Sequence, residues 1–454
     1  MTFRRTDRSE LDALFSREAE WQSWLDVEVV LADVQADLGM IPRWAAEAIA
    51  AVADVAELGL ASLEAEAART RAPIVALTRV LSVRAGEAGA YVHWGATTQN
   101  VMQAGRLLLM RRAFAKLCEH LAMAVERLAQ LADSHADTPM IGRTNRRHAL
   151  PISFGFKIAG WIEELERATD RLASMETRVF VLPFGGAVGA MHAFEGRGRE
   201  INQRMAARLG LGTMLVPGRA VNDIFADYVV QLALWAMTVE RIASELYALM
   251  GEEISEVSEN LGPEVVGSST MPHKVNPKIV VHVIAMAADL RSAAIPAMQG
   301  ALTMHEGDAA ANHLTTRTLD RVGPLALSLA RAFEELCAKV EPRPQRMVAN
   351  LVESDAHPAS ERLMMLIAPD LGHGRAHDLL HELFAAPGVG VDEIASHLAA
   401  MPELKGRLTE DGVLAALDPT TYLGESGRIA RESASLGRAV AERLRALGRT
   451  EPHR

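Results

Sequence analysis

One segment of the sequence gathers residue types that could hold an ionised carboxyl group. Residues 267–277 read Gly-Ser-Ser-Thr-Met-Pro-His-Lys-Val-Asn-Pro, so hydroxyls, a lysine, an amide and backbone donors stand within eleven positions. Such a segment can wrap a carboxylate and donate hydrogen bonds to it. The same composition also fits a capped turn before a helix that begins near Pro277, because Ser and Thr favour helix starts. Spacing alone does not choose between these two interpretations.

The elements that must position this segment are predicted to be helices. Apolar residues make up 49% of the chain and aromatic residues 5%, and Ala, Leu, Arg and Glu stand where strands prefer Val, Ile, Thr and Tyr. An apolar stripe from Asn222 to Leu249 predicts a helix of about 28 residues, roughly 42 Å long. Helices this long must pack on each other and on copies from other subunits. The predicted fold class is therefore all-α.

Breaks in the helical pattern divide the chain into three predicted domains. A length of 454 residues exceeds what one hydrophobic core usually serves. We predict an N-terminal helical domain over 1–100, a central long-helix bundle over 101–341 and a C-terminal helical domain over 342–454. Prolines and glycines predict a loop within 138–153 between two long helices, and a second loop over 261–277.

Composition excludes several classes of function. A formal net charge of -11 argues against binding to a phosphate backbone, so we expect no nucleic-acid partner. Cys118 and Cys337 are the only cysteines, so we expect no disulfide framework. Nowhere do 18 apolar residues run together, so we expect no membrane span and a cytoplasmic location. His373, His377 and His381 recur every four residues, but no carboxylate or cysteine cluster completes a metal site, so we expect no metal.

The segment 267–277 resembles the signature loop of the fumarase/aspartase superfamily, written there as Gly-Ser-Ser-x-Met-Pro-x-Lys-x-Asn-Pro. Two more segments fall in the order of that family, His-Trp-Gly-Ala-Thr-Thr-Gln-Asn at 93–100 and Gly-Arg-Thr-Asn-Arg-Arg-His-Ala-Leu-Pro at 142–151. Within the superfamily the resemblance is strongest to the 3-carboxy-cis,cis-muconate cycloisomerase branch, next to the adenylosuccinate lyases. The supporting segments are 148–157, 184–187, 376–382 and 417–424. The resemblance spans nearly the whole chain and implies a lyase or cycloisomerase that needs no cofactor.

The resemblance also implies roles for individual residues. Ser268 would act as an alkoxide-like base that removes the proton next to a substrate carboxylate, with Lys274 stabilising the charge that develops. Lys274 and Asn276 would hold that carboxylate, and Thr97 and Thr98 would supply further donors. The other predicted substrate-binding residues are His93, Arg143, Thr144, Asn145, Arg147, Ser269 and Met271.

Several positions depart from the family pattern on the side of the leaving group. Asn145 stands where adenylosuccinate lyases and fumarases carry a histidine, and an amide is no proton donor near pH 7. Arg147 replaces a usual glutamine, and Asn100 replaces an expected aspartate. Ala72-Pro73 replaces a His-Asp pair, and 217–223 lacks the usual Trp-His-Thr-Gln-Arg run. Without an acid, the favoured leaving group is one that departs as a stable anion.

Three hypotheses for the function follow. The first is a cycloisomerase-like lyase that acts on a substituted succinate or other dicarboxylate by proton abstraction and β-elimination. The second is a C–N lyase that releases fumarate with an anionic leaving group, as from nitrosuccinate. The third, motivated by Asn145, is a catalytically inactive oligomeric relative with a binding or structural role. His93 is either a substitute acid or binder, or a packed structural residue. For an active enzyme, the resemblance implies a small di- or tricarboxylate substrate and a homotetramer with active sites shared between subunits.

Overall fold

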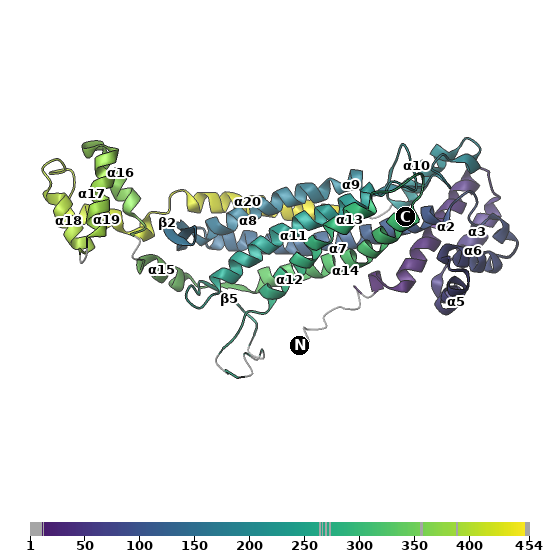
Figure 1. Cartoon of the computed structure of the whole chain (residues 1–454), viewed down its shortest axis with the longest axis horizontal. Coiled ribbons are helices and arrows are strands. Elements are labelled where there is room, and N and C mark those ends of the chain that lie inside the picture. The colour runs from purple at the N-terminus through teal and green to yellow at the C-terminus, as the bar shows by residue number, and fades with distance from the viewer. Residues whose placement is uncertain are drawn as a thin grey trace.

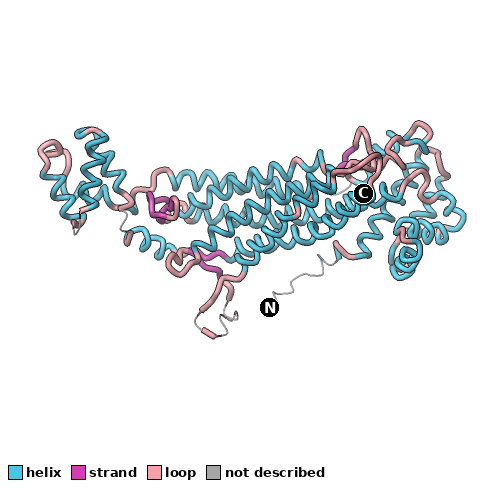
Figure 2. Tube along the Cα trace, viewed as in Figure 1, coloured by secondary structure: helices cyan, strands magenta, loops and turns pink. Residues whose placement is uncertain are grey.

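Long helices running side by side dominate the computed structural model (Figures 1 and 2). The structure describes residues 11–449 apart from 12, 263, 264, 266, 268, 269, 272, 273, 355, 356, 387 and 388. The predicted all-α fold class is confirmed, and the strands among the described residues are short. The central helices are α7 (Thr98–Ser134), α8 (Phe154–Ala173), α11 (Asp223–Leu249), α12 (Ile279–Ser292), α14 (Ala309–Lys339) and α20 (Ser426–Gly448).

The 37-residue helix α7 is the axis of the bundle. It packs against α14, α20 and α8, while α11 packs against α12. Leu121, Val125, Trp235 and Phe333 are fully buried in the resulting core. The helix predicted from residue 222 to residue 249 is observed as α11, one residue shorter at its start.

Smaller helices surround one end of the bundle (Figure 1). They are α2 (Arg17–Asp37), α3 (Arg43–Val52), α4 (Val55–Leu58), α5 (Leu60–Thr70), α6 (Pro73–Arg84), η1 (Gly86–Tyr91), α9 (Met175–Arg178), η2 (His192–Phe194) and α10 (Gly198–Leu209). Helix α2 packs against α7 and α3, and Ser16 caps its start by accepting a hydrogen bond from the backbone N–H of Ala19 at 3.0 Å. The parallel strands β3 (Val181–Leu182) and β4 (Gly212–Thr213) also lie at this end.

A second group of helices lies at the other end of the bundle. It contains α15 (Pro344–Val352), α16 (Ser360–Leu371), α17 (His373–Ala385), α18 (Val391–Ala400), α19 (Glu410–Leu417) and η3 (Pro419–Thr421). Helices α16 to α19 share a small core that includes Leu363, Ile394 and Val413. The chain then returns as α20, which packs on α7 and α8. The domain division predicted at 100 and 341 stays a prediction, in which α20 would have to be counted with the bundle.

The prediction of a loop within 138–153 is largely wrong, because this segment forms an antiparallel hairpin of β1 (Pro139–Thr144) and β2 (Arg147–Ser153). Its turn consists of Asn145 and Arg146, whose φ angles are 49° and 64°. Two successive left-handed residues are typical of a type I′ turn, which matches the twist of paired strands. Asparagine tolerates this conformation better than most residues. The conformation of the turn therefore explains why an asparagine stands at position 145, without reference to catalysis.

The turn leads to a testable expectation for Arg146. We expect Arg146→Gly to raise the free energy of unfolding by about 0.5–1 kcal/mol, because relief of about 1–2 kcal/mol of left-handed strain outweighs the backbone entropy of glycine. Urea unfolding followed by circular dichroism measures the change. The control is Arg147→Gly in extended β2, which should instead destabilise. A loss of stability in Arg146→Gly as large as in the control would contradict this account.

The third strand pair joins the segment that follows α11 to the end of α14. Strand β5 (Val257–Glu259) pairs antiparallel with β6 (Val340–Pro342), which directly follows α14.

By length and hydropathy alone, Ile279–Gly300, covering α12 and α13 (Ala294–Gly300), could cross a membrane. Helix α12 instead packs against α11 and α14 and buries Val280 and Val283, so it is a bundle helix with one uncovered face. The predicted cytoplasmic location stays a prediction.

Candidate functional site

The predicted residues Thr97 and Thr98 lie at the start of α7. Thr97 is the N-cap residue in an extended conformation, and its side chain makes no capping hydrogen bond. The first backbone N–H groups of a helix have no partner within the helix, and they carry the positive end of its dipole. The start of α7 can therefore hold a carboxylate, as can the start of other helices whose first turn remains open.

A network of amides ties this helix start to two neighbouring helices. The buried Gln99 donates to the carbonyl of Arg219 at 2.8 Å, and its Oε1 accepts from Arg219 Nε at 3.2 Å and from Asn312 Nδ2 at 2.8 Å. Asn222 Nδ2 donates to Asn312 Oδ1 at 2.8 Å, and Gln103 Nε2 donates to Asn222 Oδ1 at 3.1 Å. These bonds fix the starts of α7, α11 and α14 relative to one another.

A cavity of about 260 Å³ opens beside this network. Among the residues that line it are Thr98, Gln99, Arg106, Arg219, Asn312 and His313. Of these, the sequence predicts only Thr98. Residues 217–223 depart from the family pattern, and this departure draws attention to the segment around Arg219. No pattern in the sequence predicts that residue 219 lies next to residue 312. The cavity offers hydroxyl, amide, imidazole and guanidinium groups to a small polar ligand.

Asp308 fixes the start of α14 next to this cavity. Its carboxylate accepts from the backbone N–H groups of Ala311 at 3.2 Å, Met304 at 3.2 Å and Ala310 at 3.0 Å. The hydrogen bond from Ala311 is the largest cause that holds the pKa of Asp308 below its ordinary value, with Met304 and Ala310 adding to it. Because the negative form is favoured in the folded state, Asp308 contributes stability above its ordinary pKa and loses it in acid.

This sign gives a pH-dependent prediction. Wild type should be more stable than Asp308→Asn at neutral pH, and the difference should vanish as the pH falls from about 4 through the lowered pKa of Asp308. Asparagine is the matched comparison because it can still cap the helix without a charge. Unfolding midpoints measured from pH 7 to pH 3 test this expectation. A difference that stays constant over that range would refute the assigned cause.

His93 is held by a buried carboxylate from α2. Its Nδ1 lies 2.6 Å from Glu28 Oε1, and the Glu28 side chain is only 1% exposed. His93 has a φ of 62°, and the next residue, Trp94, accepts a hydrogen bond from buried Gln35 Nε2 at 2.7 Å. Glu28 and Gln35 thus hold the loop that leads to Thr97. Two polar residues on the otherwise apolar face of a predicted helix are the sequence signal by which Glu28 and Gln35 could be found.

Asn100 has a role in the structure that explains its departure from the family aspartate. Its Nδ2 donates to the carbonyl of Pro183 at 3.0 Å, and its Oδ1 accepts from the backbone N–H of Gly186 at 2.8 Å. The side chain is fully buried. A carboxylate would leave the Pro183 carbonyl without this donor, because an ionised aspartate only accepts hydrogen bonds.

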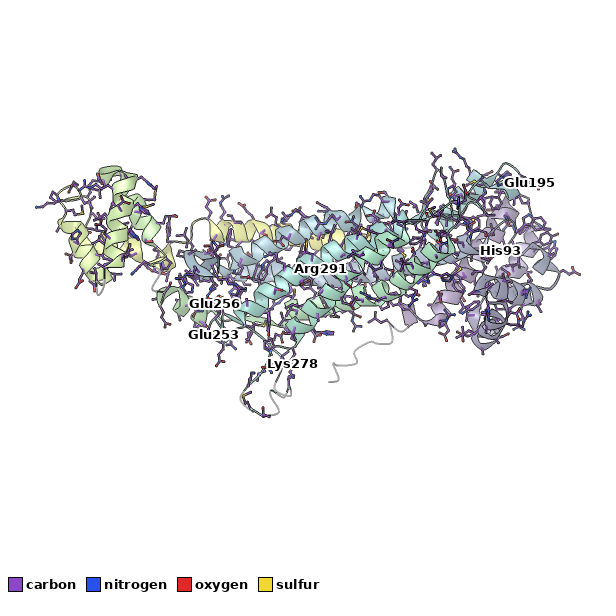
Figure 3. All side chains as sticks on the ribbon, viewed as in Figure 1. His93, Glu195, Glu253, Glu256, Lys278 and Arg291 are labelled. Atoms are coloured by element: carbon purple, nitrogen blue, oxygen red, sulfur yellow. The ribbon has the colours of Figure 1, made fainter. Side chains whose placement is uncertain are left out.

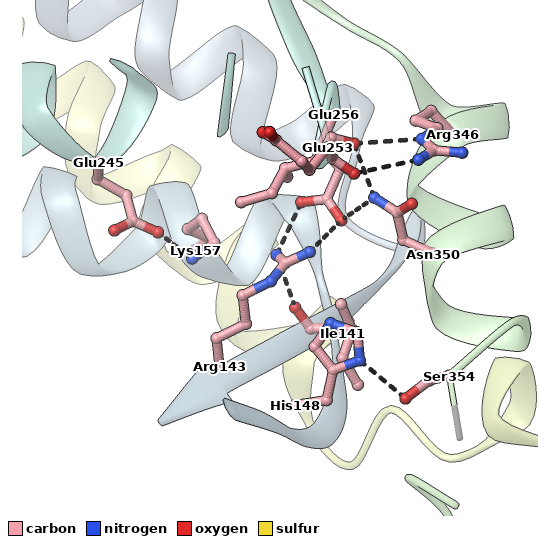
Figure 4. A network of polar contacts seen from close by, with 11 residues as sticks. Ile141, Arg143, His148, Lys157, Glu245, Glu253, Glu256, Arg346, Asn350 and Ser354 are labelled. Atoms are coloured by element: carbon pink, nitrogen blue, oxygen red, sulfur yellow. Dashed lines mark hydrogen bonds and ion pairs between the residues drawn. The ribbon is translucent and has the colours of Figure 1, made fainter. Parts of the chain in front are cut away.

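The predicted residues of the hairpin lie at the opposite end of the bundle. Arg143 forms a two-pronged ion pair with the buried Glu256, from Nη1 to Oε2 at 2.9 Å and from Nη2 to Oε1 at 2.8 Å (Figure 4). Asn350 on α15 donates to the same carboxylate at 2.9 Å. The Arg143 guanidinium is therefore already engaged within the chain. Thr144, Asn145 and Arg147 are exposed at the tip of the hairpin.

The residues that flank the signature segment (267–277) lie at the same end of the bundle as the hairpin. Glu259 accepts from the backbone N–H groups of Lys278 at 2.7 Å and Val280 at 2.7 Å and so caps α12. The backbone of Gly267 lies so close to the carbonyl of Lys274 that an added Cβ would stand 2.2 Å from its oxygen. The predicted residues Met271, Lys274 and Asn276 are exposed in the isolated chain. The predicted base Ser268 and its neighbour Ser269 lie outside the described residues.

One chain therefore places its predicted residues in two separate groups. Thr97, Thr98 and His93 lie where α7 begins, whereas the hairpin follows the end of α7, about 55 Å away at 1.5 Å per residue. Helix α14 runs from the cavity to β6, which pairs with β5 next to the root of the signature segment. Figure 3 shows this separation, with His93 at one end and Glu256 and Lys278 toward the other. No single copy can bring Thr98 and Lys274 together.

The geometry of the site does not test the predictions that the protein needs no metal and no cofactor. Within the residues that the structure describes, no group of three or more His, Cys, Asp or Glu side chains is placed to hold a metal ion. The absence of a metal and of a cofactor stays a prediction.

Comparison with known proteins connects this geometry to a family. Residues 4–290 match the family model described as lyase. The chain is 32% identical to an N-acetyl-S-(2-succino)cysteine lyase from Dickeya dadantii, over 92% of each protein. It is 33% identical to a 3-carboxy-cis,cis-muconate cycloisomerase from Pseudomonas aeruginosa, over 97% of this chain and 95% of that protein.

A solved structure agrees with these relatives over nearly the whole chain. The crystal structure of a fumarate lyase from Mesorhizobium sp. BNC1 superposes with a TM-score of 0.86 at 30% identity, covering 96% of this chain and all of that one. The predictions of the family and of an enzyme are confirmed. The chain belongs to the fumarase/aspartase superfamily, and it is a lyase of that superfamily.

Proposed function

We propose that the protein removes a proton next to a carboxylate of a substituted succinate, expels the substituent as an anion and releases fumarate. The electron pair of the broken C–H bond becomes the second C–C bond, and the substituent leaves with the electrons of its own bond to carbon. The observation that carries the proposal is the cavity at the open start of α7, lined by Thr98, Gln99 and Arg219. A helix start and hydroxyl donors suit an anionic substrate.

The groups for proton abstraction come from the signature segment of another copy. Ser268, outside the described residues, is the proposed base, and Lys274 and Asn276 are proposed to bind the carboxylate whose charge grows in the transition state. Preorganised donors of this kind are worth about 10²–10³ in rate each. The exposure of Lys274 and Asn276 in the isolated chain supports this arrangement, because both side chains remain available to a neighbouring subunit.

The assembly proposed for this chemistry is a homotetramer. Large apolar side chains are exposed on α11, α12 and α13, where Met237 is 50% exposed, Ile295 73% and Met298 51%. Exposed apolar surfaces of this kind mark protein–protein interfaces. Packing of these helices against other copies would cover them and would bring the start of α7 from one copy toward the signature segment of another.

The leaving group is proposed to depart without a strong general acid. Asn145 occupies a turn that favours asparagine, and an amide donates no proton near neutral pH. A carboxylate or a thiolate is stable enough to leave as an anion. The N-acetyl-S-(2-succino)cysteine lyase among the relatives supports a thiolate in this role. Nitrite from nitrosuccinate remains a further candidate of the same kind.

A second candidate is a 3-carboxy-cis,cis-muconate cycloisomerase. The relative with that activity is 33% identical over 97% of this chain, which favours it specifically. In such a reaction the carboxylate that leaves or attacks stays attached to the same molecule, so no fumarate forms. The same pocket and the same proposed base would serve both reactions.

Fumarate formation separates the candidates. Purified protein is incubated with nitrosuccinate, with succinyl thioethers and with 3-carboxy-cis,cis-muconate, and products are identified by chromatography. Fumarate that disappears in Ser268→Ala supports the proposal, whereas lactone formation without fumarate supports the cycloisomerase. Turnover of none of these compounds would refute both candidates and would leave the substrate of this lyase to be sought among other substituted succinates.

A further inference from the structure

Arg219 is a cation in the cavity with no anionic partner in the described part of the chain. Its side chain is half-buried, and no carboxylate of a described residue lies within ion-pair distance of its guanidinium. The second arginine that lines the cavity, Arg106, differs because it pairs with Asp320 and with Glu20. An arginine in a cavity without a countercharge suits a ligand that brings its own negative charge.

The surroundings of Arg219 fix its position. Gln99 contacts it twice, since Gln99 donates to the Arg219 carbonyl at 2.8 Å and accepts from Arg219 Nε at 3.2 Å. Nη1 donates weakly to the carbonyl of Ala187 at 3.4 Å. Gly307 packs under the guanidinium, and a Cβ at that position would stand 2.9 Å from Nε. The backbone of Arg219 and its Nε are thus held, while Nη2 makes no hydrogen bond among the described residues.

The cavity limits the size of the ligand group. Its volume of about 260 Å³ lies below the range of about 300–1,000 Å³ that holds drug-sized ligands. Within one chain this space suits a short group that ends in a carboxylate better than it suits a nucleotide. The planar guanidinium can receive such a carboxylate through paired hydrogen bonds.

We propose that Arg219 binds a carboxylate on the departing part of the substrate, so that the substrate class is a succinate whose substituent carries its own carboxyl group. This inference rests on the proposed function, because it assigns the leaving side of the same site. It makes Arg219 a specificity-determining residue, while proton abstraction stays with the groups of the signature segment. The family resemblance implies substrate-binding roles for Arg143 and Arg147, but the Arg143 guanidinium is engaged with Glu256.

A matched pair of ligands tests the charge directly. The probes are 2-(carboxymethylthio)succinate and its analogue in which the terminal carboxyl of the thioether is a carboxamide. Binding of both is measured by calorimetry, and where turnover occurs the kcat/KM ratio is measured as well. Wild type should bind the carboxylate roughly 10- to 100-fold more tightly than the carboxamide, as expected for a charge-assisted contact. This preference needs no variant and is unaffected by misfolding.

Variants then assign the preference to one residue. In Arg219→Gln the ratio between the two ligands should fall to about one, and Arg219→Lys should retain part of it because it keeps the charge without the paired geometry. The control is Arg375→Gln, an exposed arginine of α17 that pairs with Glu403, which loses the same charge and should keep the wild-type ratio.

The outcomes are distinct for the two proposals. No preference of wild type for the carboxylate, an unchanged ratio in Arg219→Gln, or tighter binding of adenosine monophosphate than of the thioether would overturn the assignment to Arg219. Fumarate released equally well from both thioethers would support the proposed elimination and would refute only the assignment of a carboxylate-binding role to Arg219. A charge preference lost in Arg219→Gln without any fumarate would show that Arg219 binds a carboxylate, but it would refute the proposed elimination and with it the placement of that carboxylate on a departing group.

Discussion

Two nearly inactive variants, Thr98→Asp and Lys274→Met, should restore each other when their chains are assembled together. Thr98→Asp puts a negative charge where the substrate carboxylate is proposed to bind, and Lys274→Met removes the proposed charge-assisted donor. Each should lower kcat/KM by roughly 10²–10³. An acidic residue in the first turn suits the helix dipole, so Thr98→Asp should still fold.

The recovery follows from the distance between the two residues within one chain. Thr98 and Lys274 lie at opposite ends of the bundle, so a complete site would take one from each of two copies. In a one-to-one mixture, roughly a quarter of the sites would receive both native segments. Activity of the co-refolded mixture, relative to wild type treated in the same way, measures that fraction.

A matched control uses two changes in one segment. Lys274→Met mixed with Asn276→Ala should recover nothing, because every site would then take its signature segment from one altered chain or the other. Recovery in this control, or none in the mixture of Thr98→Asp and Lys274→Met, would rule out sites shared between copies.

The helical scaffold was accessible to sequence reasoning because its signals are local. The stripe from Asn222 to Leu249 repeats at a period that only a helix satisfies, and α11 follows it almost to the residue. The signature segment is equally local, since eleven neighbouring residues carry the resemblance. The hairpin was not predicted because its turn contains Asn145 and Arg146 instead of the Asn-Gly pair that most strongly indicates such a turn in a sequence.

The contacts that define the site were inaccessible for a different reason. Gln99 meets Arg219 across 120 positions and Asn312 across 213 positions of the sequence. No periodicity or spacing encodes such a meeting, because it depends on how three helices pack. The return of α20 to the bundle is similar: the close approach of Gly437 to Ala129, where an added Cβ would lie 3.0 Å from the alanine side chain, depends on packing between distant segments.

Arg143→Met should destabilise the protein by about 3–5 kcal/mol, because it leaves the Glu256 carboxylate buried without its cation. The Glu256 side chain is fully buried, and after the substitution Asn350 would be its remaining hydrogen-bond donor among the contacts described above. Because Glu256 joins Arg143 of the hairpin to Asn350 of α15, the substitution would also loosen the contact between the hairpin and α15. Urea unfolding measures the effect.

The double variant Arg143→Met/Glu256→Gln is the control, because it removes both charges and should recover much of the lost stability. This comparison also decides between two roles for Arg143. A large loss in Arg143→Met that the double variant repairs, with activity recovering in parallel, identifies Arg143 as a residue that positions the hairpin. A loss below about 1 kcal/mol together with a large rise in KM would instead return Arg143 to the substrate-binding role that the family resemblance implies.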